Sequence, residues 1–456
     1  MKQVSILIII VGMLSGTLWG TKAMDPSTYK IQKVEVKGSR ISSFAFTSKV
    51  AYIGSDSGIK ASDLNPPLVL EYYNRQNSGL PSDGVTALAI RNGNELWIGT
   101  DAGLAMMTIG LIDATIPPNS PFQNAVISSL AADKDGLLWI SAIREMQDEG
   151  GWIEGMGISS YDGKSWKSYT PANSTLPESF IGSIHVDGQN RKWLATYYNT
   201  SERDHGSGLC SFDGKQFSIH GNGKSYSSVE CLAVDNAGKV WMGLAEYTEE
   251  GLLGGGLACF DGKTWTHYNT TNSDIPGDLV SDITIGKDGT VWMAVLDTDP
   301  MYPYSFGLAG FNGQEWRLIP QEKLADQGRQ ISCLATDPDG KLWVGTDNGL
   351  AVVSFPEPIA NQEHEFTPYD QPPVIVGELR PEYPDTAKRA RVQGTVVLEV
   401  EVYDDGRIGE IRVKRSVQGL DESAIEAVRK VKFKPGKAGG KPVNTMVIIP
   451  IEFRLN

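Results

Sequence analysis

Cysteine and long apolar runs are both scarce in this sequence. The 456 residues include four cysteines, Cys210, Cys231, Cys259 and Cys333, too few for a disulfide framework in so long a chain. Cys231 and Cys333 hold matching places in "VECLAVD" and "ISCLATD", so we expect buried thiols rather than bridges or metal ligands. The one long apolar run, Val4 to Leu18, falls short of the ~20 residues that span a bilayer as a helix.

That apolar run has the layout of an export signal. Lys2 precedes it, and Thr21 and Ala23 place small residues at the minus-three and minus-one positions of a cleavage site. We therefore expect residues 1–23 to be a signal peptide and the mature chain to lie in the periplasm or cell envelope. An uncleaved run acting as a membrane anchor is the alternative.

Catalytic and phosphate-binding motifs are also missing. The sequence has no GxSxG, no HExxH, no phosphate loop and no twelve-residue calcium loop ending in Glu. Its 41 basic and 55 acidic residues leave a net charge of −14, which argues against nucleic acid and anionic lipid as partners. We predict no cofactor, no metal site and no enzymatic activity.

One phrase, by contrast, is abundant. "LWIGTDAGL" (96–104) returns as "LWVGTDNGL" (342–350), and weaker copies lie before and between them. Seven copies with a period near 50 predict a mainly β chain with a seven-bladed β-propeller over residues 29–357. The aromatic positions of the copies are Tyr52, Trp97, Trp139, Trp193, Trp241, Trp292 and Trp343.

Each copy has the same internal order. An alternating strand is followed by an Asp- and Gly-rich turn such as "DPDG", then the Trp strand, then a strand opening with Gly-Leu, and often "DGKxW" before a fourth. These are hairpin signals, so each copy predicts a four-stranded antiparallel blade. We expect the Trp to pack between blades, and the strand in "YKIQKVEVKG" (29–38) to complete the last blade.

The repeat resembles that of the two-component regulator propeller family, over about residues 30–357 and best at 96–104 and 342–350. Members of that family commonly serve as extracellular sensory domains of membrane kinases. The resemblance implies the propeller fold more than a signalling role.

Four neighbouring copies, the third to the sixth, carry long insertions between the Trp strand and the Gly-Leu strand. Equivalent loops emerge on one face, so we expect a wall of rings and carboxylates there, suited to a glycan or a basic peptide. Glu202 and His205 could alternatively form an acid/base pair or bind a metal. The candidate ligand-binding residues are Trp152, Glu154, Tyr197, Tyr198, Glu202, His205, Glu246, Tyr247, Asp297, Tyr302 and Tyr304.

The last part of the chain has another pattern. A Pro-punctuated linker, 358–373, precedes a domain at 374–456 with an alternating hairpin around "DDGR", a helical stretch from Asp421 to Lys430 and a final strand, "NTMVIIPIEFRLN". The order β, β, α, β predicts a small α+β domain. It carries 15 basic and 12 acidic residues, so its charge is +3 and the remainder carries −17.

This domain resembles the TonB C-terminal domain through ordered anchors that include Tyr383-Pro384, Leu420-Asp421, Phe433-Lys434-Pro435 and Pro442-Val443. In that family an extended segment of an outer-membrane receptor adds beside the last strand, near the Tyr-Pro pair. The resemblance implies a partner contact at Tyr383, Pro384, Thr445, Val447, Ile449, Ile451 and Phe453.

Together these features predict an exported adaptor whose propeller binds a ligand or protein and whose last domain contacts an outer-membrane TonB-dependent receptor or another envelope partner. Two alternatives stay open. The propeller could be a glycan-active enzyme or a lyase, or an uncleaved N-terminus could make the chain an anchored energy transducer.

Overall fold

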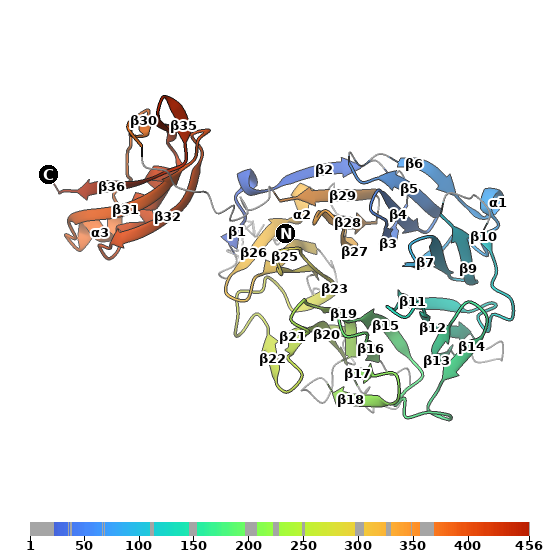
Figure 1. Ribbon diagram of the computed structural model, residues 1–456. Coiled ribbons are helices and arrows are strands. Elements are labelled where there is room, and N and C mark those ends of the chain that lie inside the picture. Colours follow the sequence, from blue (N-terminus) through green and yellow to red (C-terminus); the bar gives the residue numbers. More distant parts are fainter. Residues whose placement is uncertain are drawn as a thin grey trace, which may run out of the picture. The chain divides into compact units, whose positions relative to one another are not determined.

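The computed structural model describes residues 22–455, except 35, 37–38, 66, 68, 110–113, 146–152, 197–207, 222–227, 249–250, 297–304, 325–329, 348 and 356–368. The chain divides into two compact units, Met1–Phe355 and Pro356–Asn456 (Figure 1). Most of the expected signal peptide and of the linker therefore lies outside the described residues. Among the described helices, none has the length and apolarity that a membrane crossing requires.

The first unit is a ring of seven antiparallel sheets, the predicted propeller (Figure 1). The first strands of consecutive blades contact one another around the whole ring, including the seventh with the first. The blades, in order, are β3 Ile41–Phe46, β4 Val50–Ser55, β5 Gly58–Asp63, β6 Val69–Tyr73; β7 Val85–Arg91, β8 Glu95–Thr100, β9 Gly103–Thr108, β10 Ala114–Thr115; β11 Val126–Ala132, β12 Leu138–Glu145, β13 Ile153–Tyr161, β14 Trp166–Tyr169; β15 Ile181–Val186, β16 Lys192–Thr196, β17 Leu209–Phe212, β18 Phe217–Gly221; β19 Ser228–Val234, β20 Val240–Thr248, β21 Gly251–Phe260, β22 Trp265–Tyr268; β23 Leu279–Ile285, β24 Val291–Leu296, β25 Ser305–Phe311, β26 Trp316–Pro320; and β27 Ile331–Thr336, β28 Leu342–Thr346, β29 Gly349–Ser354. Short helices η1 Pro26–Thr28, α1 Arg75–Ser78 and α2 Gln321–Leu324 lie between strands.

The seventh blade is completed from the other end of the chain, as predicted. β2 (Lys30–Val34) pairs antiparallel with β29, from Lys30 opposite Ser354 to Val34 opposite Leu350. This pairing places the beginning of the propeller in the same sheet as its end. A two-residue strand, β1 (Lys22–Ala23), adds parallel to β26 of the sixth blade.

The repeated Trp is held by the Asp that opens the preceding turn. The indole Nε1 of Trp343 donates to one carboxylate oxygen of Asp337 at 2.9 Å, and the other oxygen accepts from the backbone N–H groups of Asp339 and Lys341. The pairs Trp139–Asp133, Trp193–Asp187 and Trp241–Asp235 repeat the bond. These turn carboxylates therefore stabilise their own hairpins and fix the ring that packs between blades.

The glycine of the "IGT" phrase sits where consecutive blades touch. A Cβ on Gly99 would lie 2.6 Å from Ile127 of the next blade, and one on Gly54 would lie 2.7 Å from Val85. The later glycine of the phrase turns the hairpin: Gly103 has a φ of 134°, and its carbonyl accepts from the Thr100 hydroxyl at 2.8 Å. The first glycine of the phrase thus allows close contact between blades, and the second allows the tight turn of the hairpin.

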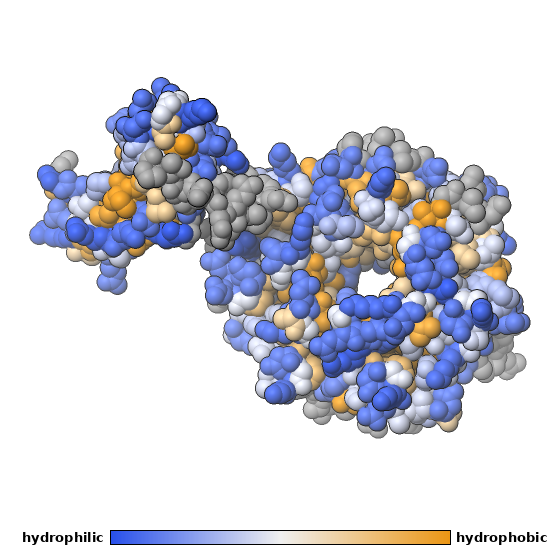
Figure 2. All heavy atoms as spheres, viewed as in Figure 1, coloured by the Kyte–Doolittle hydropathy of each residue, from blue (hydrophilic) through white to orange (hydrophobic). Residues whose placement is uncertain are grey.

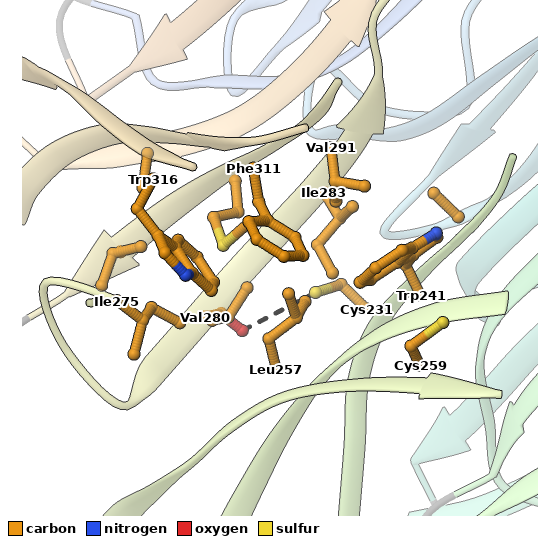
Figure 3. Close-up of a cluster of buried hydrophobic side chains, with 14 of the residues drawn as sticks. Cys231, Trp241, Leu257, Cys259, Ile275, Val280, Ile283, Val291, Phe311 and Trp316 are labelled. Atoms are coloured by element: carbon orange, nitrogen blue, oxygen red, sulfur yellow. Dashed lines mark hydrogen bonds between the residues drawn. The ribbon is translucent and has the colours of Figure 1, made fainter. Parts of the chain in front are cut away.

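The blade interfaces are apolar. Between the fifth and sixth blades, Cys231 and Trp241 pack with Val280, Ile283 and Phe311 (Figure 3). The Cys231 thiol donates weakly to the Val280 carbonyl at 3.6 Å. All four cysteines are buried and unpaired, which confirms the expectation of small buried thiols.

The second unit contains the predicted β, β, α, β order. A three-stranded sheet in the order β32-β31-β36 packs its apolar face on α4, and short β30–β33 and β34–β35 pairs flank it. The predicted helix at 421–430 is α4. The elements are β30 Val374–Val376, α3 Asp385–Arg389, β31 Gly394–Val402, β32 Ile408–Arg415, α4 Asp421–Arg429, β33 Lys432–Lys434, β34 Gly436–Ala438, β35 Lys441–Val443 and β36 Thr445–Phe453.

Replacing Asp337 with Ala should test the Trp–Asp bond. The change removes three accepted hydrogen bonds from a side chain that is almost fully buried, so we expect a loss of roughly 2–4 kcal/mol in unfolding free energy. Asp339→Ala, in the exposed part of the same turn, is the matched control. Equal midpoints for the two variants in urea denaturation would contradict the assignment.

Candidate functional site

The predicted wall lies largely outside the described residues. Glu154 is exposed on β13, opposite Arg144 of β12. Glu246 and Tyr247 belong to β20. The remaining candidates, Trp152, Tyr197, Tyr198, Glu202, His205, Asp297, Tyr302 and Tyr304, fall outside the described part of the chain.

The bases of two insertions are described, and both are β-ribbons. β12 and β13 pair as far as Glu145 opposite Ile153, and β20 and β21 as far as Thr248 opposite Gly251. In the second blade, by comparison, β8 and β9 close at Thr100 opposite Gly103. We call the face on which these hairpins emerge the insertion face. The hairpins on this face are long in the third and fifth blades and short in the first, second and seventh blades.

The inner strands line a central channel, which opens through the ring in Figure 2. All seven carry a bulge at the same register, the first between Ile41 and Ser43 and the last between Ile331 and Cys333. Below the bulges the channel holds a cavity of about 730 Å³, to which the apolar residues Phe44, Leu88 and Ile184 and the polar residues Thr284 and Thr336 contribute. One register of the seven inner strands carries apolar residues throughout: Phe44, Leu88, Leu130, Ile184, Leu232, Ile283 and Leu334.

A half-buried carboxylate lies on the inner strand of the sixth blade. Asp282, in the sixth blade, accepts hydrogen bonds from its neighbour Ile283 N at 2.9 Å and from Leu334 N of the seventh blade at 2.6 Å. Burial raises the pKa of Asp282 to about 6, despite these two donors. The carboxylate ties the two blades together through their backbones.

In the second unit, β36 is an edge strand. Within the described residues it pairs with β31 and with no other strand, so its second row of backbone groups is open. The predicted contact residues Thr445, Val447, Ile449, Ile451 and Phe453 direct their side chains to the core of the unit. A partner that pairs with this edge would therefore meet the backbone of these residues rather than their side chains.

Pro450 shows which backbone groups face outward. Proline has no N–H, so within a sheet it occupies the side of an edge strand that does not bond to the neighbour. Residues two apart share that orientation, which assigns Met446, Ile448 and Glu452 to the same outward set as Pro450. Ile448 is also 56% exposed, among the largest exposures of an apolar side chain in the described residues.

Tyr383 lies at one end of this strand, as the resemblance implied. Its ring packs edge-on against Phe453, with centroids 5.4 Å apart, and its hydroxyl donates to the Val392 carbonyl. Pro384 directly precedes α3, and its carbonyl accepts from Lys388 N. The Tyr-Pro pair thus anchors the start of α3, and Tyr383 contacts the last residue of β36.

Comparison with known families separates the two units. Residues 380–455 match the model of the Gram-negative bacterial TonB protein C-terminal region. The C-terminal unit is thus a TonB-like domain. Protein tonB2 of Pseudomonas aeruginosa is 42% identical over 78 residues, which are 17% of this chain and 29% of that protein. TonB of Vibrio cholerae is 33% identical over 88 residues, 19% of this chain and 36% of that protein. The chain therefore spans about a third of the length of these curated relatives.

The propeller has its own relatives. Residues 327–348 match the two-component regulator propeller model. The extracellular domain of a hybrid two-component system from B. thetaiotaomicron superposes with a TM-score of 0.54 at 16% identity, covering 86% of this chain and 52% of that one. YCF48, in a structure with the D1 peptide, gives a TM-score of 0.51 at 13% identity over 75% of this chain and 100% of that one. At these identities the likeness is one of fold.

Sequence reasoning missed Asp282, although the repeat alignment contains a signal. The equivalent positions of the fifth and seventh blades are Cys231 and Cys333, which are small and buried. A carboxylate in a column of small buried residues is costly unless it is hydrogen-bonded, so it marks a tie between blades.

Asp282 predicts a pH dependence of stability. The pKa of Asp282 rises from the ordinary 3.8 to about 6 on folding. Its contribution to the unfolding free energy is therefore full below pH 3.8 and is lost as the pH rises through 6. Asp282→Asn should therefore remove roughly 3 kcal/mol of pH dependence from the unfolding free energy across this window. Urea denaturation at several pH values measures it, with Asp339→Asn as the control. Parallel pH profiles for Asp282→Asn and the wild type would refute this prediction.

Proposed function

We propose that this chain is a non-enzymatic adaptor of the cell envelope. Its TonB-like domain pairs the open edge of β36 with an extended segment of an outer-membrane TonB-dependent receptor or another envelope protein. The propeller binds its ligand or protein partner on the insertion face. A glycan or a basic peptide suits that face. The observation that carries the proposal is an unpaired edge strand in a unit that matches the TonB C-terminal family.

Strand addition suits this edge for a physical reason. An incoming strand gains main-chain hydrogen bonds from groups that are already held in extended geometry by β31, so little further ordering of the domain is needed. The exposed Ile448 side chain offers the newcomer an apolar neighbour on the solvent face. Tyr383 supports the end of this strand by packing against Phe453.

The charges of the two units favour different partners. The domain from residue 373 onward carries +3, and the remainder of the chain carries −17. An acidic propeller attracts basic ligands and repels anionic surfaces, whereas the near-neutral TonB-like domain depends on backbone pairing. The adaptor therefore combines two kinds of binding. The affinity of the acidic propeller for a basic ligand falls as the salt concentration rises, whereas the affinity of β36 for an added strand depends little on salt.

Proline at position 448 should abolish partner binding without unfolding the domain. Ile448→Pro removes an outward N–H, while the inward bonds of β36 to β31 remain. Ile448→Thr keeps the N–H and a β-branched side chain, and serves as the matched control. The full chain, tagged and incubated with solubilised outer membranes, should recover TonB-dependent receptors as wild type and as Ile448→Thr, and should lose them at least about tenfold as Ile448→Pro.

Circular dichroism and thermal unfolding of the three proteins establish that the domain is folded in each. Equal receptor recovery by folded Ile448→Pro and Ile448→Thr would refute pairing at this edge. Recovery of no receptor by the wild type would refute the adaptor function itself.

A further inference from the structure

We propose that the mouth of the central channel, on the low side of the insertion face, binds a small basic zwitterion of the L-lysine type. The site is a cavity of about 340 Å³ shared by the seventh, first and second blades. That volume lies at the lower end of small-molecule sites, about 300–1,000 Å³. It is lined by Arg40, Ile41, Ser42, Asp56, Gly84, Val85, Thr86, Asp101 and Ser332.

The position of the cavity follows from the short hairpins. In the first and second blades the second and third strands are joined by two residues each, and the first of these is Asp56 or Asp101. Asp56 N donates to the Arg40 carbonyl at 3.2 Å, and Asp101 N donates to the Gly84 carbonyl at 3.0 Å. Both aspartates are thereby held at the start of an inner strand, beside the channel mouth.

Gly84 leaves room for the Asp101 carboxylate at the edge of the cavity. A Cβ at residue 84 would lie 2.5 Å from Asp101 Oδ2, so any other residue would displace the carboxylate. This close approach is specific to the second blade, since the corresponding residue of the first blade is Arg40. The two blades together supply both signs of charge to one cavity.

The guanidinium of Arg40 is available to a ligand. It is exposed, and among the described residues it forms no ion pair within 4.0 Å, although two carboxylates line the same cavity. A guanidinium binds a carboxylate through two parallel hydrogen bonds. We assign the α-carboxylate of the ligand to Arg40.

Three hydroxyl-bearing residues, Ser42, Thr86 and Ser332, line the cavity. The Ser42 hydroxyl donates to the Val85 carbonyl and the Ser332 hydroxyl to the Ile41 carbonyl, both at 2.5 Å, so these two tie neighbouring blades. The Thr86 hydroxyl, at the same register of the second blade, is buried and has no partner. Its oxygen has almost no accessible surface, so the charged groups of a ligand bind to the exposed charged side chains of the cavity instead.

Charge and shape select the ligand class. One guanidinium and two carboxylates leave the cavity with a net charge of −1, which a zwitterion with one additional ammonium neutralises. Asp56 and Asp101, whose side chains are exposed, receive the two ammonium groups, and the aliphatic stem of the ligand spans the open mouth of the cavity. Acidic amino acids and phosphates place an uncompensated negative charge against the two aspartates.

This site deepens the proposed ligand binding by the propeller and is independent of β36. Isothermal titration of the full chain with L-lysine tests it, alongside L-glutamate and 1,5-diaminopentane, which has both ammonium groups but no carboxylate. We expect saturable binding of L-lysine and at least about tenfold weaker binding of L-glutamate. Failure here leaves the receptor recovery experiment unaffected, so the two proposals fail separately.

Two variants assign the groups. Arg40→Met should weaken the binding of L-lysine at least about tenfold and leave the affinity for 1,5-diaminopentane within about twofold of the wild type. Asp101→Asn should weaken the binding of both ligands. Asp339→Asn, the same charge change in the inner turn of the seventh blade, is the control, and thermal unfolding checks that each variant is folded. Absence of saturable L-lysine binding to the wild type, equal binding of L-glutamate, or equal affinities for both variants and the control would overturn the proposal.

Discussion

The pairing of β2 with β29 is the constraint on which the propeller depends. Among the described strands the inner-strand contacts run between neighbouring blades, and joining the first blade to the last leaves neither of them with an open face. Five consecutive residue pairs, from Lys30 and Ser354 to Val34 and Leu350, make that join within a single sheet. The closed ring in turn fixes the spacing of the inner strands, and with it the size of the channel and of its mouth.

The Trp and the glycines of the repeated phrase have separate structural roles. The Trp and the preceding Asp lock a hairpin to the blade interface, and the middle glycine admits the next blade's branched side chain. Departures from the phrase are compensated locally. In the second blade, where Arg91 replaces the Asp, Glu95 accepts the bond from the Trp97 indole at 3.0 Å, and the Arg91 guanidinium lies over the same ring.

Periodicity predicted what the blades share and failed on what distinguishes them. The number of blades, the order of their strands and the completion of the seventh blade by residues near 30 all follow from a pattern written seven times. Asp282, Arg40 and Thr86 each stand at a position where the other copies carry different residues, so a search for what the copies share passes over them. The pairs β30–β33 and β34–β35 have three residues per strand, too few to show an alternation that a sequence search can detect.

The two units manage their strand edges in opposite ways. The propeller uses its first strand to complete its last blade, whereas the TonB-like domain leaves β36 open, and an open apolar edge invites unwanted pairing between chains. Pro450, Glu452 and Arg454 reduce that hazard, because a missing N–H and two charges make the edge a poor template for general aggregation. In the proposed strand addition, the stretch around Ile448 is the part of the edge that remains for a partner. An edge that is protected at one end and open at the other favours short partners, and the extended receptor segment of the proposed adaptor meets that condition better than a second copy of β36 does.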